Sequence, residues 1–454
     1  MNKCYFDLCQ EQSGKTDDYI KKGAFEKKDL FFIAGIIGVY FLFRMIPYSS
    51  SLSYLLQISI AASSIILYLQ KPIMTFPVIL ILNVLPNQIF YATNSEFANH
   101  YQLNSTMVLI MLGIMFAYKL FVCKKGKLVV GMNSTYLFPM VFLMAISVVG
   151  AVQPAYYSLD FYMLLLIYIA IPFFMESEND VNIVWLSFCL CGTLFSFTLF
   201  SNLNTFGNIY EMAVMADRNY LAMFGVISLM FLINFVSAKH KSKYRVLSIG
   251  AIIVSAIIAW LIFSFASRTA FILMILFIAL QLMTTFGNNK KAAFIITVGT
   301  AILIWLVYNS EVASFLFARF QMASATTGNG RYTIAAEFLS GFWDSNILRK
   351  LMGYGLNGYL VTGHVAHNVY LGVLLDFGVL CFILLMIVLV KITYYLWRSK
   401  YRLFLVSFLI FLVYMGTLDA HTDPAGACFL SAMAGIADVG KKDLYRIKLG
   451  ELEI

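Results

Sequence analysis

Arginine side chains stand at two positions where an apolar helix is predicted to begin. Arg218 lies between Asp217 and Asn219, and Arg268 follows Ser267, each directly before a long apolar run. A guanidinium near the free backbone N–H groups of a helix start suits an anion such as a phosphate. At a membrane interface an arginine also snorkels to water or pairs with lipid headgroups. Both interpretations are open for each arginine.

Histidine supplies a second kind of chemistry. His364 and His367 are three residues apart and would share a face if that stretch were helical. Imidazole titrates near neutral pH, which makes histidine the usual general base. A zinc pair is the competing interpretation, but no third ligand lies nearby. Asp419, His421 and Asp423 form a triplet that could hold a cation, although acidic turns between spans are common.

The longest connection between apolar runs, residues 310–366, has a pattern of its own. It contains Arg319 and then a flexible, glycine-containing stretch at 326–330. After Arg331 a helical period places Ile334, Phe338 and Phe342 on one face. Closely spaced glycines follow in 353–359, a segment that also carries Tyr354 and Tyr359. Such glycines permit tight turns or close approach to a ligand.

The rest of the chain must supply the elements that hold these residues. Of 454 residues 61% are hydrophobic and 12% charged, and the mean hydropathy is +0.81. A soluble domain needs far more surface charge, so that class is excluded. Apolar runs of roughly 17–25 residues recur, long enough to cross a bilayer as helices. We predict an all-α, polytopic membrane protein with about 12–14 transmembrane helices and a large external loop between late helices.

The predicted spans lie near residues 30–47, 51–70, 73–91, 106–122, 135–153, 157–175, 182–200, 218–237, 246–265, 269–286, 292–309, 367–390, 403–418 and 424–439. They divide the chain into a tail (1–29), helices 1–11 (30–309), the external loop (310–366), helices 12–14 (367–439) and a second tail (440–454).

Positive charge predicts the orientation. With alternating sides, 25 of the 32 Lys and Arg residues fall on one side, which is then cytoplasmic. Both termini lie on that side, and the net charge of +9 reflects topology and not nucleic-acid binding. The acidic loop 176–180 is the one cytoplasmic connection without a positive charge. Seven cysteines without CxxC spacing indicate neither a disulfide framework nor a metal site.

Five segments in order resemble motifs of the bacterial O-antigen ligase and polymerase family. They are 217–222, 267–270, the pair 330–331 before the amphipathic helix, 353–355, and 367–372, which leads to Asp376 and Gly378. The resemblance covers roughly residues 215–390. It implies a membrane-embedded glycosyltransferase without a cofactor in the bacterial cytoplasmic (inner) membrane. Donor and acceptor would be undecaprenyl-diphosphate-linked oligosaccharides, and a chain-length regulator protein is a further implied partner.

The resemblance implies roles for the residues above. His367 would take the proton of the acceptor hydroxyl, while Arg268 and Arg331 clamp the diphosphate without a metal. Direct displacement would invert the anomeric configuration. Substrate contacts are expected from Arg218, Arg319, Asn368, His364, Tyr354, Tyr359 and Asn219. Aromatic residues at an interface are usually anchors, so stacking of the tyrosines on sugar is a hypothesis.

Two alternatives stay open. A ligase would move the finished glycan to lipid A core, whereas the favoured polymerase extends it on the lipid carrier. A lipid-linked oligosaccharide flippase is the rival from another class. Transport predicts polar residues at mid-membrane and broken helices. The conspicuous charges here sit at span ends, which favours the enzyme.

Overall fold

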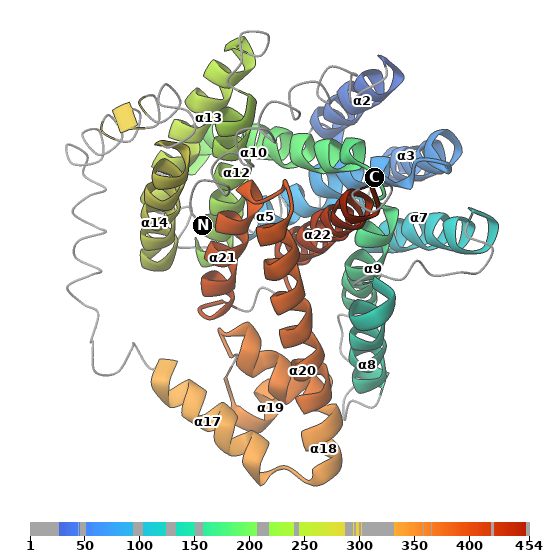
Figure 1. Cartoon of the computed structure of the whole chain (residues 1–454), viewed down its shortest axis with the longest axis vertical. Helices are drawn as coiled ribbons and strands as arrows, with labels where there is room; N and C mark the ends of the chain where they lie inside the picture. Colours follow the sequence, from blue (N-terminus) through green and yellow to red (C-terminus); the bar gives the residue numbers. More distant parts are fainter. Residues whose placement is uncertain are drawn as a thin grey trace.

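The computed structural model of the chain describes residues 27–43, 45, 51–93, 103–123, 133–149, 158–206, 218–239, 245–286, 294, 297–298, 301, 331–356, 358–364, 366–418 and 422–450. Within these ranges the regular structure is entirely helical, which confirms the all-α class. Seven helices are long and apolar enough to cross a membrane, and four shorter apolar helices accompany them in the same ranges. The polytopic membrane architecture is thereby confirmed (Figure 1).

Every predicted span except 292–309, most of which lies outside the described residues, overlaps a helix. The span helices are α2 (Lys27–Phe43), α3 (Ser51–Tyr68), η1 (Pro72–Met74) with α4 (Thr75–Ile79), η2 (Leu80–Val84) and α5 (Leu85–Thr93), α7 (Ser105–Tyr118) with η3 (Lys119–Cys123), η4 (Asn133–Leu137) with α8 (Phe138–Val149), α9 (Ser158–Phe174), α10 (Glu178–Phe206), α12 (Arg218–Lys239), α13 (Arg245–Ser264), α14 (Arg268–Phe286), α20 (Val369–Arg398), α21 (Leu403–Met415) and α22 (Pro424–Gly450).

The helix over residues 72–93 is the most deeply buried span and is not regular. Residues 80–84 form a π-helical turn, and this turn leaves the Leu82 carbonyl available to accept the Leu103 N–H at 2.7 Å. The Asn83 side chain donates to the Leu103 carbonyl at 2.8 Å, so the two segments clasp each other. Asn83 and Gln88 are fully buried in this span. Uncharged polar side chains are therefore buried within this span.

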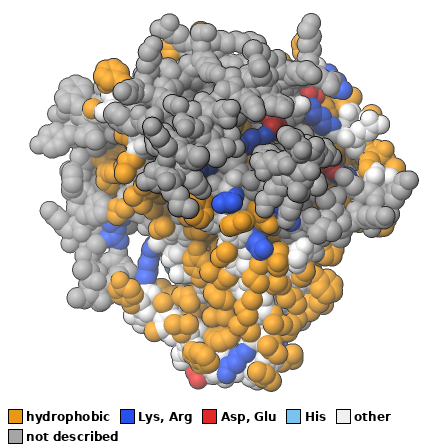
Figure 2. All heavy atoms as spheres, in the orientation of Figure 1, with side chains coloured by type: hydrophobic (Ala, Val, Ile, Leu, Met, Phe, Trp, Pro, Cys, Tyr) orange, Lys and Arg blue, Asp and Glu red, His pale blue; other side chains and the backbone are white. Residues whose placement is uncertain are grey.

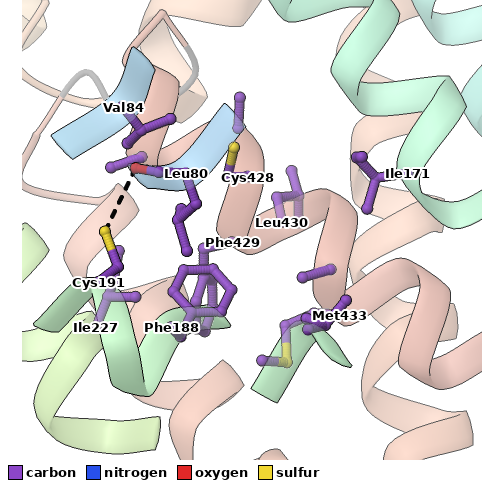
Figure 3. Packing of buried hydrophobic residues seen from close by; sticks show 14 of the residues in the cluster. Leu80, Val84, Ile171, Phe188, Cys191, Ile227, Cys428, Phe429, Leu430 and Met433 are labelled. Atoms are coloured by element: carbon purple, nitrogen blue, oxygen red, sulfur yellow. Dashed lines mark hydrogen bonds between the residues drawn. The ribbon is translucent and has the colours of Figure 1, made fainter. Parts of the chain in front are cut away.

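Aromatic and sulfur side chains fill the centre of the bundle around this span. Phe188 of α10 stacks on Phe231 of α12 with 4.1 Å between ring centroids. Phe429 of α22 meets Phe188 edge-on, and the Cys191 thiol donates to the Leu80 carbonyl (Figure 3). Interlocking aromatic pairs of this kind add roughly 0.5–1.5 kcal/mol each beyond their buried area. The core thus joins helices that are distant in sequence.

Ion pairs join segments that the charge count assigns to one side of the membrane. Lys71 donates to the buried Asp29 carboxylate at 2.6 Å. Glu176 and Glu178 of the acidic loop pair with Lys119 (3.4 Å) and Lys400 respectively. The loop that lacks positive charge therefore receives it from two other segments.

The helix α20 is broken. Gly378 has φ 79° and ψ 174°, which separates residues 369–377 from the long second half. The break leaves two carbonyl groups without intrahelical donors. The glycine segment (residues 353–359) supplies the donors: Tyr354 N–H donates to Leu375 O (3.0 Å) and Gly355 N–H to Asp376 O (2.6 Å). The helix over the predicted span 367–390 begins at Val369, is interrupted at Gly378 and ends at Arg398.

Three short helices pack on this break and form what we call the loop lobe: α17 (Arg331–Asp344), α18 (Ile347–Met352) and α19 (Gly358–Thr362) (Figure 1). The predicted amphipathic helix is confirmed as α17, in which Phe338 and Phe342 are buried. Gly358 N–H donates to the Asp376 carboxylate at 2.8 Å, which ties α19 to the same break.

Replacing Gly378 by alanine should lower the thermal stability of the detergent-purified protein more than Gly363→Ala does. Both glycines have φ above +70°, so both substitutions incur roughly 1–2 kcal/mol of strain. Only the Cβ at 378 would also fall onto the Leu351 carbonyl, whereas nothing lies within 4 Å of a Cβ at 363. Thermal unfolding monitored by size-exclusion chromatography measures the difference. Equal losses for the two variants would contradict the packing of the loop lobe into the break.

Candidate active site

Three helices begin around the end of α21. They are α12 at Arg218, α14 at Arg268 and α20 at Val369. The Tyr414 hydroxyl, in the last turn of α21, donates to the Asn219 carbonyl at 3.2 Å. The Asn368 amide donates to the Gly416 carbonyl at 3.0 Å. The end of α21 therefore joins the start of α12 to the start of α20.

The starts of α12 and α14 are also joined directly. The Ser267 hydroxyl donates to the Asn219 side-chain oxygen at 3.0 Å. Arg268 is the first residue of α14 and is partly buried beside this bond. Two segments that resemble family motifs, 217–222 and 267–270, thus lie in contact although 48 residues separate the bonded pair.

Asn368 determines where α20 begins. Its side-chain oxygen accepts the N–H groups of Tyr370 (2.9 Å) and Leu371 (3.2 Å), the usual arrangement of an N-cap. Its amide nitrogen is used by Gly416, and the Tyr370 hydroxyl donates to Leu412 O at 2.9 Å. Among the described residues, the Asn368 side chain serves the backbone of α20 and α21, a structural use that the sequence did not indicate.

Backbone strain is concentrated at this place. Within the described part of the chain, the non-glycine residues with positive φ are Ala266, Leu356 and His367. Ala266 immediately precedes the Ser267–Arg268 pair, and His367 (φ 46°) immediately precedes the cap of α20. The four positive-φ glycines lie at 353, 355, 363 and 378, in the loop lobe and the break that it fills. Strained residues of this kind cluster at functional sites, because surrounding structure must hold them in place.

The electrostatics of the arrangement favour an anion. Each of the three helix starts presents the positive end of a macrodipole, and the C-terminal end of α21 presents a negative one beside them. Arg268 adds a full positive charge at one start, and His367 adds an imidazole at another. A small apolar cavity adjoins α20, lined by Val369, Val373 and Met415 among others. This cavity has a volume of about 20 Å³, which is too small for a lipid tail.

The structure brings some predicted residues together and leaves others apart. Arg268, Asn219, Asn368 and His367 lie on adjoining helix starts. Arg331 is exposed at the start of α17, and no contact among the described residues joins it to Arg268. The pairing of these arginines as one clamp remains a prediction.

His364 and His367 lie in different surroundings, and Tyr354 bonds within the loop lobe. His364 and His367 do not share a helical face, because Gly363 and His367 adopt positive φ and the stretch is irregular. His364 is exposed, 3.7 Å from the Glu337 carboxylate of α17. The Tyr354 hydroxyl hydrogen-bonds with Ser345 at 2.8 Å. Gly353 lies against the backbone of α20 and Gly355 against that of α8, so the close contacts of these glycines are with the protein itself.

Several predicted positions lie outside the described residues. They include Arg319 entirely, as well as the side chains of Arg218 and Tyr359. Of the acidic triplet only Asp423 is described. Its carboxylate accepts Ala425 N–H, Gly426 N–H and the Gln88 amide, so it caps α22.

Residues that complete the site were missed from the sequence. Ser267 and Tyr370 lie inside the segments that resemble family motifs, but the resemblance implies no role for either. Tyr414 lies within the predicted span 403–418, and no motif contains it. A tyrosine at the end of an apolar run reads as an interfacial anchor. Only the folded chain shows that Tyr414 bridges to Asn219 across 195 residues.

Comparison with known proteins gives no family assignment. No protein-family profile matches the chain, and no curated protein sequence matches it. The function must therefore be argued from the site.

Asn368→Asp and Asn368→Ala should separate the two tasks of this side chain. Aspartate keeps the oxygen that caps α20 but loses the amide that donates to Gly416, whereas alanine loses both. We expect the melting temperature to fall for aspartate and further for alanine, each lost interaction being worth about 1 kcal/mol. Asn346→Ala is the matched control, because Asn346 caps α18 through Arg349 N–H alone. A loss for Asn368→Ala no larger than for Asn346→Ala would contradict the bridge to α21.

Proposed function

We propose that the protein is a glycosyltransferase that polymerises undecaprenyl-diphosphate-linked oligosaccharide units at the outer face of the bacterial cytoplasmic membrane. The observation that carries the proposal is the hydrogen-bonded junction of three helix starts, with Arg268 on one and the strained His367 beside another. The residues that resemble the family's motifs are distant in sequence, yet four of the five segments meet in this junction and the adjoining break in α20. Of the fifth segment, Arg331 is described, and it is the first residue of the lobe packed on that break.

The reaction creates negative charge on the leaving diphosphate and releases a proton from the acceptor hydroxyl, so the site must stabilise the charge and accept the proton. When the anomeric carbon–oxygen bond breaks, the electron pair stays on the diphosphate and negative charge grows there. Arg268 and the N-termini of α12 and α14 would stabilise that charge, with Arg331, Arg218 and Arg319 as further contacts. The acceptor hydroxyl forms the new bond to the anomeric carbon while His367 takes its proton. Attack from the face opposite the leaving group inverts the configuration.

The geometry suits a base that must not drift. The backbone of His367 has a positive φ, and the next residue, Asn368, caps α20 with its side chain. The backbone at His367 is therefore held by the start of α20. The Asn368 amide bonds to Gly416 and Tyr414 bonds to Asn219, so the backbone beside His367 and the start of α12 are tied to the same end of α21. Preorganisation of this kind is what lets a site stabilise developing charge without reorganising.

Transport is the second candidate, and two observations favour it. The break in α20 and the π-helical turn at 80–84 are interrupted helices, and Asn83 and Gln88 are buried inside a span. Interrupted helices with buried polar groups are typical of transporters. However, Asn83 donates to Leu103 and Gln88 to Asp423, so both amides join helices to one another. A structural use accounts for the amide nitrogens, whereas the buried side-chain oxygens of Asn83 and Gln88 have no hydrogen-bond partner among the described residues. The enzyme is preferred because the arginine and histidine residues lie at the junction of helix starts.

The test is complementation of a deletion strain, with surface glycan separated on a gel. We expect His367→Ala to lower long-chain glycan about 10²-fold or more, the usual loss for a missing general base. Arg268→Ala should cost about 10²-fold, as expected for a lost charge contact in the transition state. Arg398→Ala, at the opposite end of α20, is the matched control and should restore normal glycan. Immunoblotting of the membrane fraction confirms that each variant is made.

The deletion strain itself distinguishes the candidates. Core bearing a single repeat unit identifies the polymerase, whereas bare core with polymer retained on the lipid carrier identifies a ligase. Lipid-linked units trapped on the cytoplasmic side identify a flippase. If His367→Ala and Arg268→Ala both complement fully, the assigned chemistry is wrong.

A further inference from the structure

The helix α17 has three faces, and packing within the loop lobe does not account for one of them. Phe338 and Phe342 face α20 and are buried. Glu337 and Asp344 belong to a polar face. The third face is an exposed apolar stripe at spacings of four, three and four residues. It consists of Tyr332, Ala336, Leu339 and Trp343. A helix in contact with water on two sides needs no second apolar stripe.

The helix α18 continues this stripe. None of its residues is buried, and Ile347 and Leu348 are 73% and 65% exposed. Trp343 is 67% exposed and lies beneath the Lys350 ammonium, 5.8 Å from the ring centroid. Contiguous apolar surface on this scale marks contact with a membrane or another protein.

The end of α18 lies against two spans, α8 and α20, that carry exposed apolar side chains. Met352, the last residue of α18, accepts a hydrogen bond from Ser147 of α8, and Val149 of α8 is exposed nearby in sequence. On the other side a Cβ at Gly378 would meet Leu351, and Leu380 of α20 is exposed two residues later. Figure 2 shows hydrophobic side chains covering the lower part of the visible face, with lysine or arginine at its tip. Because the exposed apolar side chains of α17 and α18 adjoin those of the spans, we expect lipid to cover both surfaces.

We infer that the exposed stripe of α17 and α18 is inserted into the lipid leaflet nearest the candidate site. Trp343 would lie at the headgroup level, where indole is most favourable, and Lys350 beside it would meet lipid phosphates. The polar face that carries Glu337 would point to water. Held in this way, the loop lobe fixes the depth of the break in α20, and with it the depth of His367. The inference does not depend on which reaction the site performs.

The test measures the fluorescence of Trp343 in vesicles of phosphatidylcholine and phosphatidylglycerol. The wild-type spectrum minus that of Trp343→Phe isolates its emission, and Trp185→Phe, at a buried tryptophan, is the matched control. Lipids brominated near the headgroup should quench about half of the Trp343 emission, while aqueous iodide quenches little of it. Quenching by iodide, or shielding from both agents, would overturn the inference, since the latter means that another protein chain covers the stripe.

A second variant keeps the test independent of folding. Ile347→Asp with Leu348→Asp changes two exposed side chains, so the protein should fold with an unchanged melting temperature in detergent. In vesicles the same variant should move Trp343 from lipid quenching to iodide quenching. If lipid quenching persists at the wild-type level, the stripe is not what holds α17 and α18 at the bilayer.

Discussion

An interrupted helix inside a membrane must find new partners for its carbonyl groups, and the structure depends on how α20 does so. The break at Gly378 leaves Leu375 and Asp376 without intrahelical donors, and lipid offers none. The N–H groups of Tyr354 and Gly355 supply them. Glycines at 353 and 378 allow this segment and α20 to approach so closely, and Gly355 leaves room for the backbone of α8. A loop segment thereby supplies the backbone donors that the interrupted helix lacks.

This arrangement determines the direction of the first half of α20 and therefore the geometry of the candidate site. Once residues 369–377 leave the axis of the span, Asn368 can reach the end of α21 and Tyr370 can bond to Leu412. From α21 the connection continues through Tyr414 and Asn219 to Ser267. Each step is a side-chain hydrogen bond at a helix end. Three helices contribute their N-termini, the positive ends of their dipoles, and α21 contributes its C-terminus.

The sequence predicted what local patterns encode. Apolar length predicted the spans, and the recurrence of Ile334, Phe338 and Phe342 predicted α17. The break in α20 was missed because a glycine within an apolar run is compatible with an unbroken transmembrane helix. The π-helical turn was missed for a similar reason, since its partner Leu103 is not local. The arginine and histidine segments could be selected by residue type, but their junction depends on Tyr414, whose position at a span end suggested only an anchor.

The contacts of the loop lobe have a consequence for the order in which the chain is assembled in the membrane. The ribosome makes α17 and α18 before α20, so the carbonyls that the glycine segment must bind do not yet exist when that segment is synthesised. The contact of α8 with the loop lobe forms later still after α8 is made, because Ser147 and its acceptor Met352 are 205 residues apart. Long-range pairings of this kind form slowly. Insertion of the spans must therefore precede maturation of the site, and the junction of helix starts is completed only after α21 has entered the bilayer.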